Sequence, residues 1–512
     1  DCPYAVAGAS FPGMPGVVIG HNNRIAWGVT NANPDVQDLY VERTNPLNPD
    51  EYRVCERWVA MDVRYEEISV RGGDPQRLRV RGTRHGPVIN DLAGPAAAAW
   101  THGWQPLALR WTGGEPGGMA RAILAVNRAG DWEAFHAALR YFDVPGQNVV
   151  YADVAGNIGY QMTGRIPIRR DGSGAIPAPG WMDNYEWAGY VDYEDLPSAL
   201  NPTGGSLVSA NNRAVGPDFA HAMGHDWNRG RRAARIEEML AVRDAVSAED
   251  CVTVQCDTLV HYAERLLSYL PLLTADDTRA EHALTLLERW DRRADPDLVA
   301  PSLFAAWYVA VSEAVFADEL GEDVLSRYLI GSSLSVLDAL DSVLAGERVA
   351  WCDDVASAAV ETCAEMVDRS FGAALDDLED RLGHNMNAWR WGRLHRATFT
   401  NATFGQSDIA PVEALFNRGP VAVGGTCDTV NNICFDPRAP YGALLLPTYR
   451  QIIDVGAWEN SLAINMTGQS GHAFHRHYDD MIPLWRDGEY HPMLWHREDI
   501  MRAAEGVLVL RP

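Results

Sequence analysis

The chain has 512 residues, of which 47% are hydrophobic and 22% are charged, so it can bury a large core and is not a disordered protein. Its formal net charge of −26 and isoelectric point near 4.9 argue against nucleic acid or an anionic membrane surface as a partner. We see no apolar run close to the roughly 18–20 residues that cross a bilayer, so no transmembrane segment is expected.

All 43 basic residues are Arg. A strongly acidic chain without Lys fits a protein adapted to high salt, in which acidic side chains keep the surface solvated. A GC-rich genome that replaces Lys codons with Arg codons explains the same composition. Composition does not decide between the two explanations.

Short strands separated by Gly, Pro and Asn turns are predicted for residues 5–110. The clearest of them are residues 16–20, 78–83 and 85–89. Residues 118–141 change to helical spacing, and a strand returns at residues 148–152. The first part of the chain is therefore rich in sheet.

A helical insertion is predicted for residues 231–385, where apolar residues such as Ile236, Met239 and Leu240 recur at helical spacing. Strands and turns return after residue 395, with a strand at residues 449–454. We find no repeat, low-complexity segment or flexible linker, so residues 1–512 are expected to form a single body.

The eight cysteines are too sparse for a disulfide scaffold. Cys427 and Cys434 flank a polar loop and could form a disulfide in an oxidising compartment. Buried free thiols are the more common outcome for scattered cysteines, so the sequence favours free thiols here.

Four motif blocks in a fixed order carry the most information. They are Gly20-His-Asn-Asn-Arg-Ile-Ala-Trp-Gly-Val-Thr-Asn31 with the following Asp35-Val-Gln-Asp38, then Pro145-Gly-Gln-Asn148 with Gly156-Asn-Ile-Gly159, then Asn201 to Arg213, and finally Gly468-Gln-Ser-Gly471 with His477-Tyr-Asp-Asp480. Together they resemble the penicillin acylase family of N-terminal nucleophile hydrolases. The resemblance spans nearly the whole chain.

This resemblance implies an α+β fold, a four-layer αββα sandwich with a large helical insertion, which periodicity alone does not indicate. It also implies an amidohydrolase that cleaves an N-acyl amide through an acyl-enzyme on an N-terminal Ser. The chain begins Asp-Cys-Pro-Tyr, so the expected nucleophile is missing from it, and the chain alone is expected to be inactive. A smaller companion chain from the same precursor is the expected partner.

A catalytically inactive, calcium-stabilised binding protein of the same fold is the alternative. The coding sequence upstream of Asp1 would distinguish the two, because only the enzyme needs an in-frame Ser preceded by a spacer and a smaller chain. The resemblance implies a periplasmic or extracellular protein, whose export signal would lie upstream of this chain.

Three polar residues are candidate catalytic groups. Asn211 matches the family's oxyanion-hole asparagine, and Asn31 lies where a backbone N–H supplies the second donor. Arg232, at the start of a predicted helix, matches the arginine beside the family's active site, although Arg231 and Arg235 compete for this assignment. No other hydrolase or phosphate-binding signature is present.

A structural calcium site is also implied. Asp35 and Asp38 flank the backbone carbonyl of Gln37, and these hard oxygen ligands suit Ca²⁺. Gly174 falls where a further main-chain ligand is expected, and Asp218 is a doubtful additional carboxylate because its local spacing departs from the family pattern.

Ile19 and Val29 align with positions that line the family's acyl pocket, which suggests an apolar acyl group. Phenylacetyl, aliphatic and acyl-homoserine lactone substrates all remain open. His472, His475 and His477 form a tight cluster, which we interpret as structural and not as a zinc site.

Overall fold

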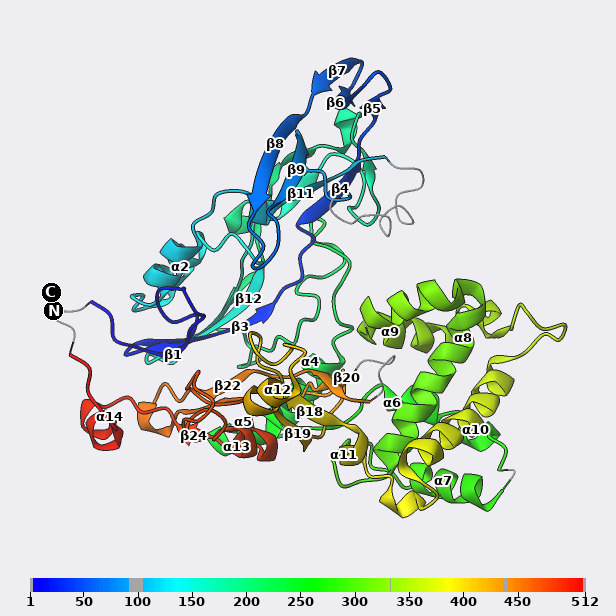
Figure 1. Ribbon diagram of the computed structural model, residues 1–512. Coiled ribbons are helices and arrows are strands. Elements are labelled where there is room, and N and C mark those ends of the chain that lie inside the picture. The colour runs from blue at the N-terminus through cyan, green and yellow to red at the C-terminus, as the bar shows by residue number, and fades with distance from the viewer. Residues whose placement is uncertain (1–2, 92–104, 276, 332, 436–440, 510–512) are drawn as a thin grey trace. The chain divides into compact units, whose positions relative to one another are not determined.

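The computed structural model describes residues 3–91, 105–275, 277–331, 333–435 and 441–509 (Figure 1). The chain divides into two compact units, one ending at Asn228 and one beginning at Arg229. Each unit is described by itself, and the single continuous body expected from the sequence stays a prediction. Residues 1–2, and residues 92–104 of the predicted strand-rich segment, lie outside the described residues.

Unit 1, up to Asn228, is built mainly from strands. These are β1 (Val6–Ala9), β2 (Ile19–Asn22), β3 (Ile25–Asn31), β4 (Gln37–Val41), β5 (Thr44–Asn45), β6 (Asn48–Val54), β7 (Arg57–Ala60), β8 (Asp62–Ile68), β9 (Gln76–Thr83), β10 (Gly86–Pro87), β11 (Leu107–Trp111), β12 (Gln147–Asp153), β13 (Ile158–Met162), β14 (Pro167–Arg169), β15 (Ala178–Pro179), β16 (Trp187–Tyr190) and β17 (Ser198–Leu200). The α-helices among the described residues of this unit are α2 (Met119–Val126) and α3 (Trp132–Leu139).

A six-stranded antiparallel sheet in the order β1-β2-β3-β12-β13-β17 forms the centre of this unit. Ile25 and Trp27, two residues apart on β3, point to the same face of the sheet and pack with Phe135 and Leu139 of α3. Helices α2 and α3 therefore cover that face. Gly159 allows strand β13 to pack closely against Trp132 of α3, because a Cβ at position 159 would lie 2.3 Å from the Trp132 ring. Thr30 and its neighbours on the opposite face form the polar network described below.

Four smaller sheets complete the unit, in the orders β10-β9-β8, β11-β4-β15, β14-β16 and β5-β6-β7. The strand predicted at residues 78–83 is confirmed as β9, and the helical segment 118–141 is confirmed as two helices. The strand predicted at residues 16–20 is wrong for its first part. Gly16 has a φ of 96°, and the Val17 N–H donates to the Asn127 side chain, so β2 begins only at Ile19.

Every named element of unit 2 between Arg231 and Leu382 is a helix or a short 3₁₀ turn. The α-helices of the unit are α4 (Arg231–Ala241), α5 (Ala248–Gln255), α6 (Ala263–Leu267), α7 (Thr278–Glu288), α8 (Ala300–Gly331), α9 (Ser333–Leu344), α10 (Cys363–Leu382), α11 (Trp391–Leu394), α12 (Ala410–Phe416), α13 (Ile482–Asp487) and α14 (Arg497–Ala503).

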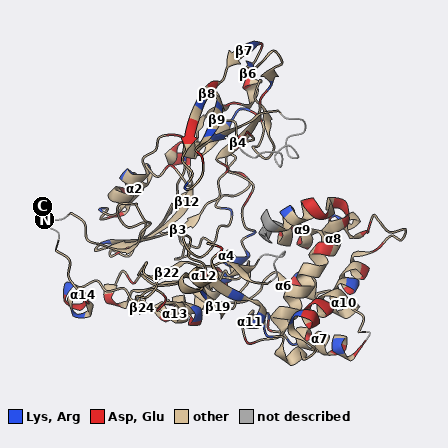
Figure 2. Cartoon of the chain, in the orientation of Figure 1, with Lys and Arg blue, Asp and Glu red and all other residues tan. Residues whose placement is uncertain are grey.

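Helices α8 and α10 pack together through fully buried aromatic residues. The Trp307 and Phe371 rings meet edge to face, and the Trp307 indole donates to the Val367 carbonyl at 3.1 Å. Thr362 and Glu365 form a reciprocal capping box at the start of α10. Figure 2 colours acidic residues red along α8, α9 and α10.

The segment Ala300–Leu329 is long and apolar enough to cross a membrane, with a mean hydropathy of 1.3, and the absence of a transmembrane segment stays a prediction. However, 78% of its most apolar window is buried inside the protein, as a core helix requires. The helix is also interrupted at Gly321, where φ is 69°.

The remaining strands of unit 2 are β18 (Arg396–Phe399), β19 (Arg418–Ala422), β20 (Cys434–Phe435), β21 (Ala443–Leu445), β22 (Tyr449–Ile452), β23 (Leu462–Asn465) and β24 (His491–Pro492). They form two sheets, in the orders β19-β18-β21-β20 and β22-β23-β24. The strand predicted at residues 449–454 is confirmed as β22.

Candidate active site

Asn31 ends strand β3 in unit 1 and pairs with Gln147 of β12. The next residue, Ala32, donates its N–H to the Gly146 carbonyl at 3.2 Å. Because hydrogen bonds alternate along an antiparallel pair, the Asn31 N–H is directed away from β12. The register of β2 with β3 reaches only Trp27, so the described part of β2 does not pair with this end of the β3 edge.

Asn211 lies beside the peptide group that joins Asn31 to Ala32. Its Nδ2 donates to the Asn31 carbonyl at 3.0 Å, although the two residues are 180 positions apart in sequence. Asn211 has a φ of 62°, a conformation that Asn tolerates better than most residues, and its carbonyl accepts the Asn228 N–H. The structure therefore brings together the two residues predicted as oxyanion donors.

A polar network holds the Asn31 peptide from the face of the sheet opposite the helices. Asn148, which is 2% exposed, donates to the Asn31 carbonyl at 3.1 Å and to Thr30 Oγ1 at 3.2 Å. Tyr160 OH donates to Asn148 Oδ1 at 2.6 Å, and the Thr30 and Ser209 hydroxyls lie 2.6 Å apart. This network fixes the peptide against which Asn211 is held.

Asn148 and Ser209 belong to the motif blocks, but the sequence alone did not suggest a role for either residue. Asn148 could have been identified as a polar residue at the start of strand β12. Ser209 could have been identified by its position in the Asn201–Arg213 block. Thr30 and Tyr160 were also missed, because a single Thr or Tyr in a strand carries no distinguishing pattern.

The two predicted acyl-pocket residues are not brought together. Gly20 pairs with Trp27, so their side-chain directions share one face of the sheet. Val29 shares the face of Trp27 and packs against the helix-covered core, whereas Ile19, next to Gly20, points to the opposite face. Ile19 and Val29 therefore face opposite sides of this sheet, and their assignment to one acyl pocket stays a prediction.

The predicted calcium residues do lie together, but around an arginine. Arg169 Nε donates to Asp38 Oδ2 at 2.9 Å, and its Nη2 lies 3.1 Å from Asp35 Oδ2. The Trp187 indole donates to Asp38 Oδ2 at 2.5 Å. Burial raises the pKa of Asp35, while Arg169 opposes this shift.

The other predicted ligands border the same guanidinium. The Gln37 carbonyl lies 3.5 Å from Arg169 Nη2, and a Cβ on Gly174 would lie 2.7 Å from it. Asp218 is exposed. As arranged, these residues do not fit a calcium ion, because a positively charged donor stands among the oxygens that would coordinate the ion.

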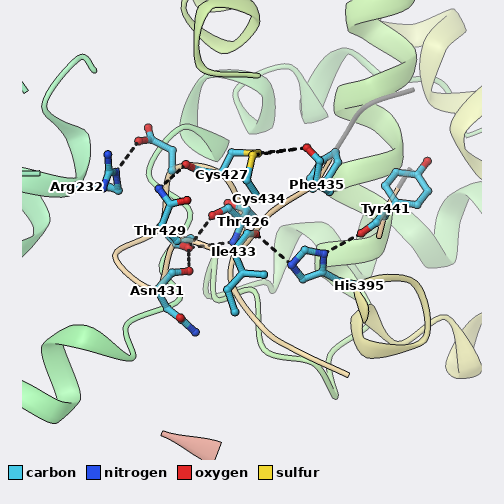
Figure 3. The surroundings of a disulfide bond; sticks show 12 residues. Arg232, His395, Thr426, Cys427, Thr429, Asn431, Ile433, Cys434, Phe435 and Tyr441 are labelled. Carbon is cyan, nitrogen blue, oxygen red and sulfur yellow. Dashed lines mark hydrogen bonds and ion pairs between the residues drawn. A yellow bond between two sulfur atoms is a disulfide. The ribbon is translucent and has the colours of Figure 1, made fainter. Parts of the chain in front are cut away.

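Arg232, labelled in Figure 3, is the second residue of helix α4 in unit 2. Its side chain is 12% exposed. Its Nε lies 3.8 Å from Asp428 Oδ1. Burial lowers the pKa of Arg232, and Asp428 opposes this effect. Of the competing arginines, Arg231 bonds both Asp338 at 3.0 Å and Asp428 at 3.3 Å, whereas Arg235 bonds Asp257 at 2.9 Å.

Asp428 is 3% exposed and lies in the loop between Cys427 and Cys434. Burial raises its pKa to about 6, although Arg231 and Arg232 lower it. The structure joins Cys427 to Cys434 in a disulfide, so the free thiols favoured by the sequence are wrong here (Figure 3). A second disulfide, Cys352–Cys363, was not foreseen.

The His cluster has ordinary polar partners. His477 Nδ1 lies 2.6 Å from Asp480 Oδ2, and His477 Nε2 lies 2.9 Å from Glu505 Oε1. Within the described parts of the chain, no group of three His, Cys, Asp or Glu side chains is placed to hold a metal ion.

A family model described as Penicillin amidase matches residues 1–502. The chain belongs to the penicillin amidase family. The resemblance seen in the four motif blocks is thereby confirmed.

Curated relatives in the penicillin amidase family carry two kinds of name. The chain is 29% identical over 95% of its length to the acyl-homoserine lactone acylase QuiP of Pseudomonas aeruginosa, and it covers 61% of that protein. It is 29% identical over 98% of its length to the penicillin acylase 2 proenzyme of a Pseudomonas species, and it covers 63% of that protein. It thus spans about three fifths of the relatives' length.

Among solved structures, the thermostable penicillin G acylase from Alcaligenes faecalis matches with a TM-score of 0.73 at 22% identity. The match covers 100% of this chain and 93% of that one. Identity this low shows the fold alone. The structural match confirms the predicted α+β class and the fold of the N-terminal nucleophile hydrolases for this member of the penicillin amidase family.

Proposed function

We propose that the protein to which this chain belongs hydrolyses N-acyl amides. The observation that carries the proposal is the Asn211 amide held against the Asn31 peptide, 3.0 Å from its carbonyl oxygen. Amide hydrolysis needs hydrogen-bond donors fixed in advance where the carbonyl oxygen becomes negative. Family membership and the relatives' names, acyl-homoserine lactone acylase and penicillin acylase, support the same reaction class.

In this proposal Asn211 Nδ2 and the Asn31 N–H stabilise the tetrahedral oxyanion. The nucleophile is an N-terminal Ser on a segment that is not among these 512 residues, and it forms an acyl-enzyme that water then hydrolyses. A smaller companion chain arises from the same precursor, as the word proenzyme in one relative's name suggests. Arg232 is kept as the candidate arginine near the substrate.

The substrate class is an amide with an apolar acyl group. Val29 remains a candidate for the acyl pocket, whereas Ile19 points to the other face of the sheet. We propose a periplasmic or extracellular location, which the disulfides Cys352–Cys363 and Cys427–Cys434 support, because disulfides persist in oxidising compartments.

The test is an assay of the protein expressed from its complete coding sequence. Purified protein is incubated with a long-chain N-acyl-homoserine lactone, penicillin G and a chromogenic phenylacetyl amide, and release of the free amine is measured. Turnover of any one of these, lost on replacement of the N-terminal Ser, supports the proposal. A correctly folded, processed protein that releases no amine from the three substrates contradicts it and favours the inactive binding protein.

A further inference from the structure

Arg169 contacts Asp35, Gln37 and Asp38, three of the residues at which a calcium ion was expected. Its Nε donates to both carboxylate oxygens of Asp38, at 2.9 and 3.1 Å. Its Nη2 lies 3.1 Å from Asp35 Oδ2, 3.4 Å from the Asp35 carbonyl and 3.5 Å from the Gln37 carbonyl. The guanidinium therefore stands at the point on which these oxygens converge.

The side chains of Arg169, Asp35 and Asp38 are largely shielded from water. The side chains of Arg169 and Asp38 are 8% and 7% exposed, and that of Asp35 is 22% exposed. Burying two carboxylates without a counter-charge would be costly, so a cation of some kind is required at this position. Arg169 supplies one positive charge in a planar group whose donors match carboxylate geometry.

The surrounding backbone leaves little space for an additional ion. A Cβ on Gly174 would lie 2.3 Å from Asp35 Oδ2 and 2.7 Å from Arg169 Nη2, so this backbone packs directly on the ion pair. Calcium requires 6–8 oxygen ligands at about 2.3–2.6 Å, and it could enter only if the guanidinium left.

Two paired strands hold Arg169 in this position. It ends β14, where it pairs with Trp187 of β16. Both side chains reach the same carboxylate, because the Trp187 indole donates to Asp38 Oδ2 at 2.5 Å. Asp38 lies on β4, so the contact ties the β14–β16 hairpin to another sheet of unit 1.

We propose that Arg169 takes the place of the metal ion, so that the Asp35–Asp38 loop is closed by a guanidinium and neither binds nor requires Ca²⁺. This departs from the calcium site implied by the family resemblance. It concerns the stability of unit 1 and does not depend on the proposed function.

The first experiment uses the purified protein from its complete coding sequence. After gel filtration in chelator-free buffer, its calcium content is measured by plasma emission spectroscopy, and its melting temperature is then recorded with EGTA and with millimolar CaCl₂. We expect no stoichiometric calcium and one melting temperature in both conditions. Calcium near one ion per protein, together with a melting temperature that falls in EGTA, would overturn the proposal, because a ligand specific for the folded state must stabilise it.

The second experiment compares Arg169→Met with Arg170→Met in EGTA. Met keeps the length and apolar contacts of the side chain but removes the charge. Arg170 is the matched control, because it is exposed and, among the described residues, its guanidinium bonds the Asp183 carbonyl at 3.4 Å and no carboxylate. We expect Arg169→Met to melt several degrees lower or to fail to fold, and Arg170→Met to match the wild type. Equal melting temperatures for the two variants would contradict the proposal.

Discussion

At the scale of single residues, the candidate site depends on a few side-chain amides. Asn148 and Asn211 both donate to the Asn31 carbonyl, and Tyr160 in turn holds Asn148. Their orientation is thus set before any substrate arrives. Electrostatic preorganisation of this kind is a major source of rate enhancement in acyl transfer, because donors that are already aligned need no rearrangement in the transition state.

Replacing Asn211 tests this arrangement. In the complete enzyme, Asn211→Ala should lower kcat by about 10²–10³ with little change in KM, because an oxyanion donor acts mainly on the transition state. Asn211→Gly should behave alike, and it removes the strain of Ala at a φ of 62°. Steady-state kinetics on the amide substrate measure both variants.

Asn31→Ala is the control for that experiment. Its backbone N–H is retained, and its side chain only accepts a bond from Gln147 Nε2 at 2.8 Å. The loss of kcat should therefore be much smaller than at Asn211. Equal losses at the two positions would show that the side-chain and main-chain donors are wrongly assigned.

Asp428 gives a prediction about pH. Its folded pKa is raised to about 6 by burial, despite Arg231 and Arg232, and the ordinary value for Asp is about 3.9. The folded protein thus holds a proton more tightly than the unfolded chain, so this contribution to stability is present at low pH and is lost as pH rises from about 4 to 6.

Asp428→Asn cannot ionise and should lack this pH dependence. Relative to the wild type, the variant should gain up to roughly 3 kcal/mol of unfolding free energy between pH 4 and pH 7. Urea unfolding at intervals of one pH unit measures the difference, which also cancels the titration of the other acids. A difference that stays constant over this range would mean that Asp428 ionises normally in the folded protein.

At the scale of elements, the sequence identified contiguous features well. Motif blocks identified the family and hence the fold, and the strand predicted at 148–152 is β12, Gln147–Asp153. Asn31 and Asn211 were found because each belongs to such a block. Local patterns of apolar and turn residues are enough for predictions of this kind.

Contacts between distant segments could not be predicted in this way. Arg169 and Asp38 are 131 positions apart, and nothing local to either residue predicts their contact. The opposite orientations of Ile19 and Val29 depend on the register of β2 with β3, which spacing does not reveal. The pairing of Cys352 with Cys363, 11 positions apart, depends on how the loop between the 3₁₀ helix Val349–Cys352 and the start of α10 folds back, which residue spacing does not reveal.

The Cys427–Cys434 disulfide should stabilise the loop that carries Asp428. Closing so short a loop is worth about 2 kcal/mol through the entropy of the unfolded chain. Replacing both cysteines with Ser should therefore lower the melting temperature and should remove part of its sensitivity to reducing agent. Cys251→Ser is the matched control, because this partly buried cysteine is a free thiol. If thiol titration of the denatured, unreduced protein already detects Cys427 and Cys434, the disulfide does not form.

At the scale of the whole molecule, charge is the dominant property. The chain carries 69 acidic residues against 43 arginines, and Figure 2 colours acidic residues red along the helices α8, α9 and α10 of unit 2. Ion pairs neutralise some acidic side chains locally, as at Arg279, which bonds Asp376 and Glu379, but the net charge is unchanged. The remaining acidic side chains repel one another in the folded state, and the strength of that repulsion depends on salt.

If the absence of Lys and the net charge of −26 reflect a saline habitat, salt should stabilise the fold. Raising KCl from about 0.1 M to above 1 M shortens the Debye length from ~10 to ~3 Å and screens the repulsion. The melting temperature should therefore rise across this range with calcium and pH held constant. Codon bias in a GC-rich genome predicts no such requirement, since swapping Lys for Arg changes no charge. A flat or falling curve would support codon bias, and repeating the series with NaCl would show whether the gain depends on the cation or on ionic strength alone.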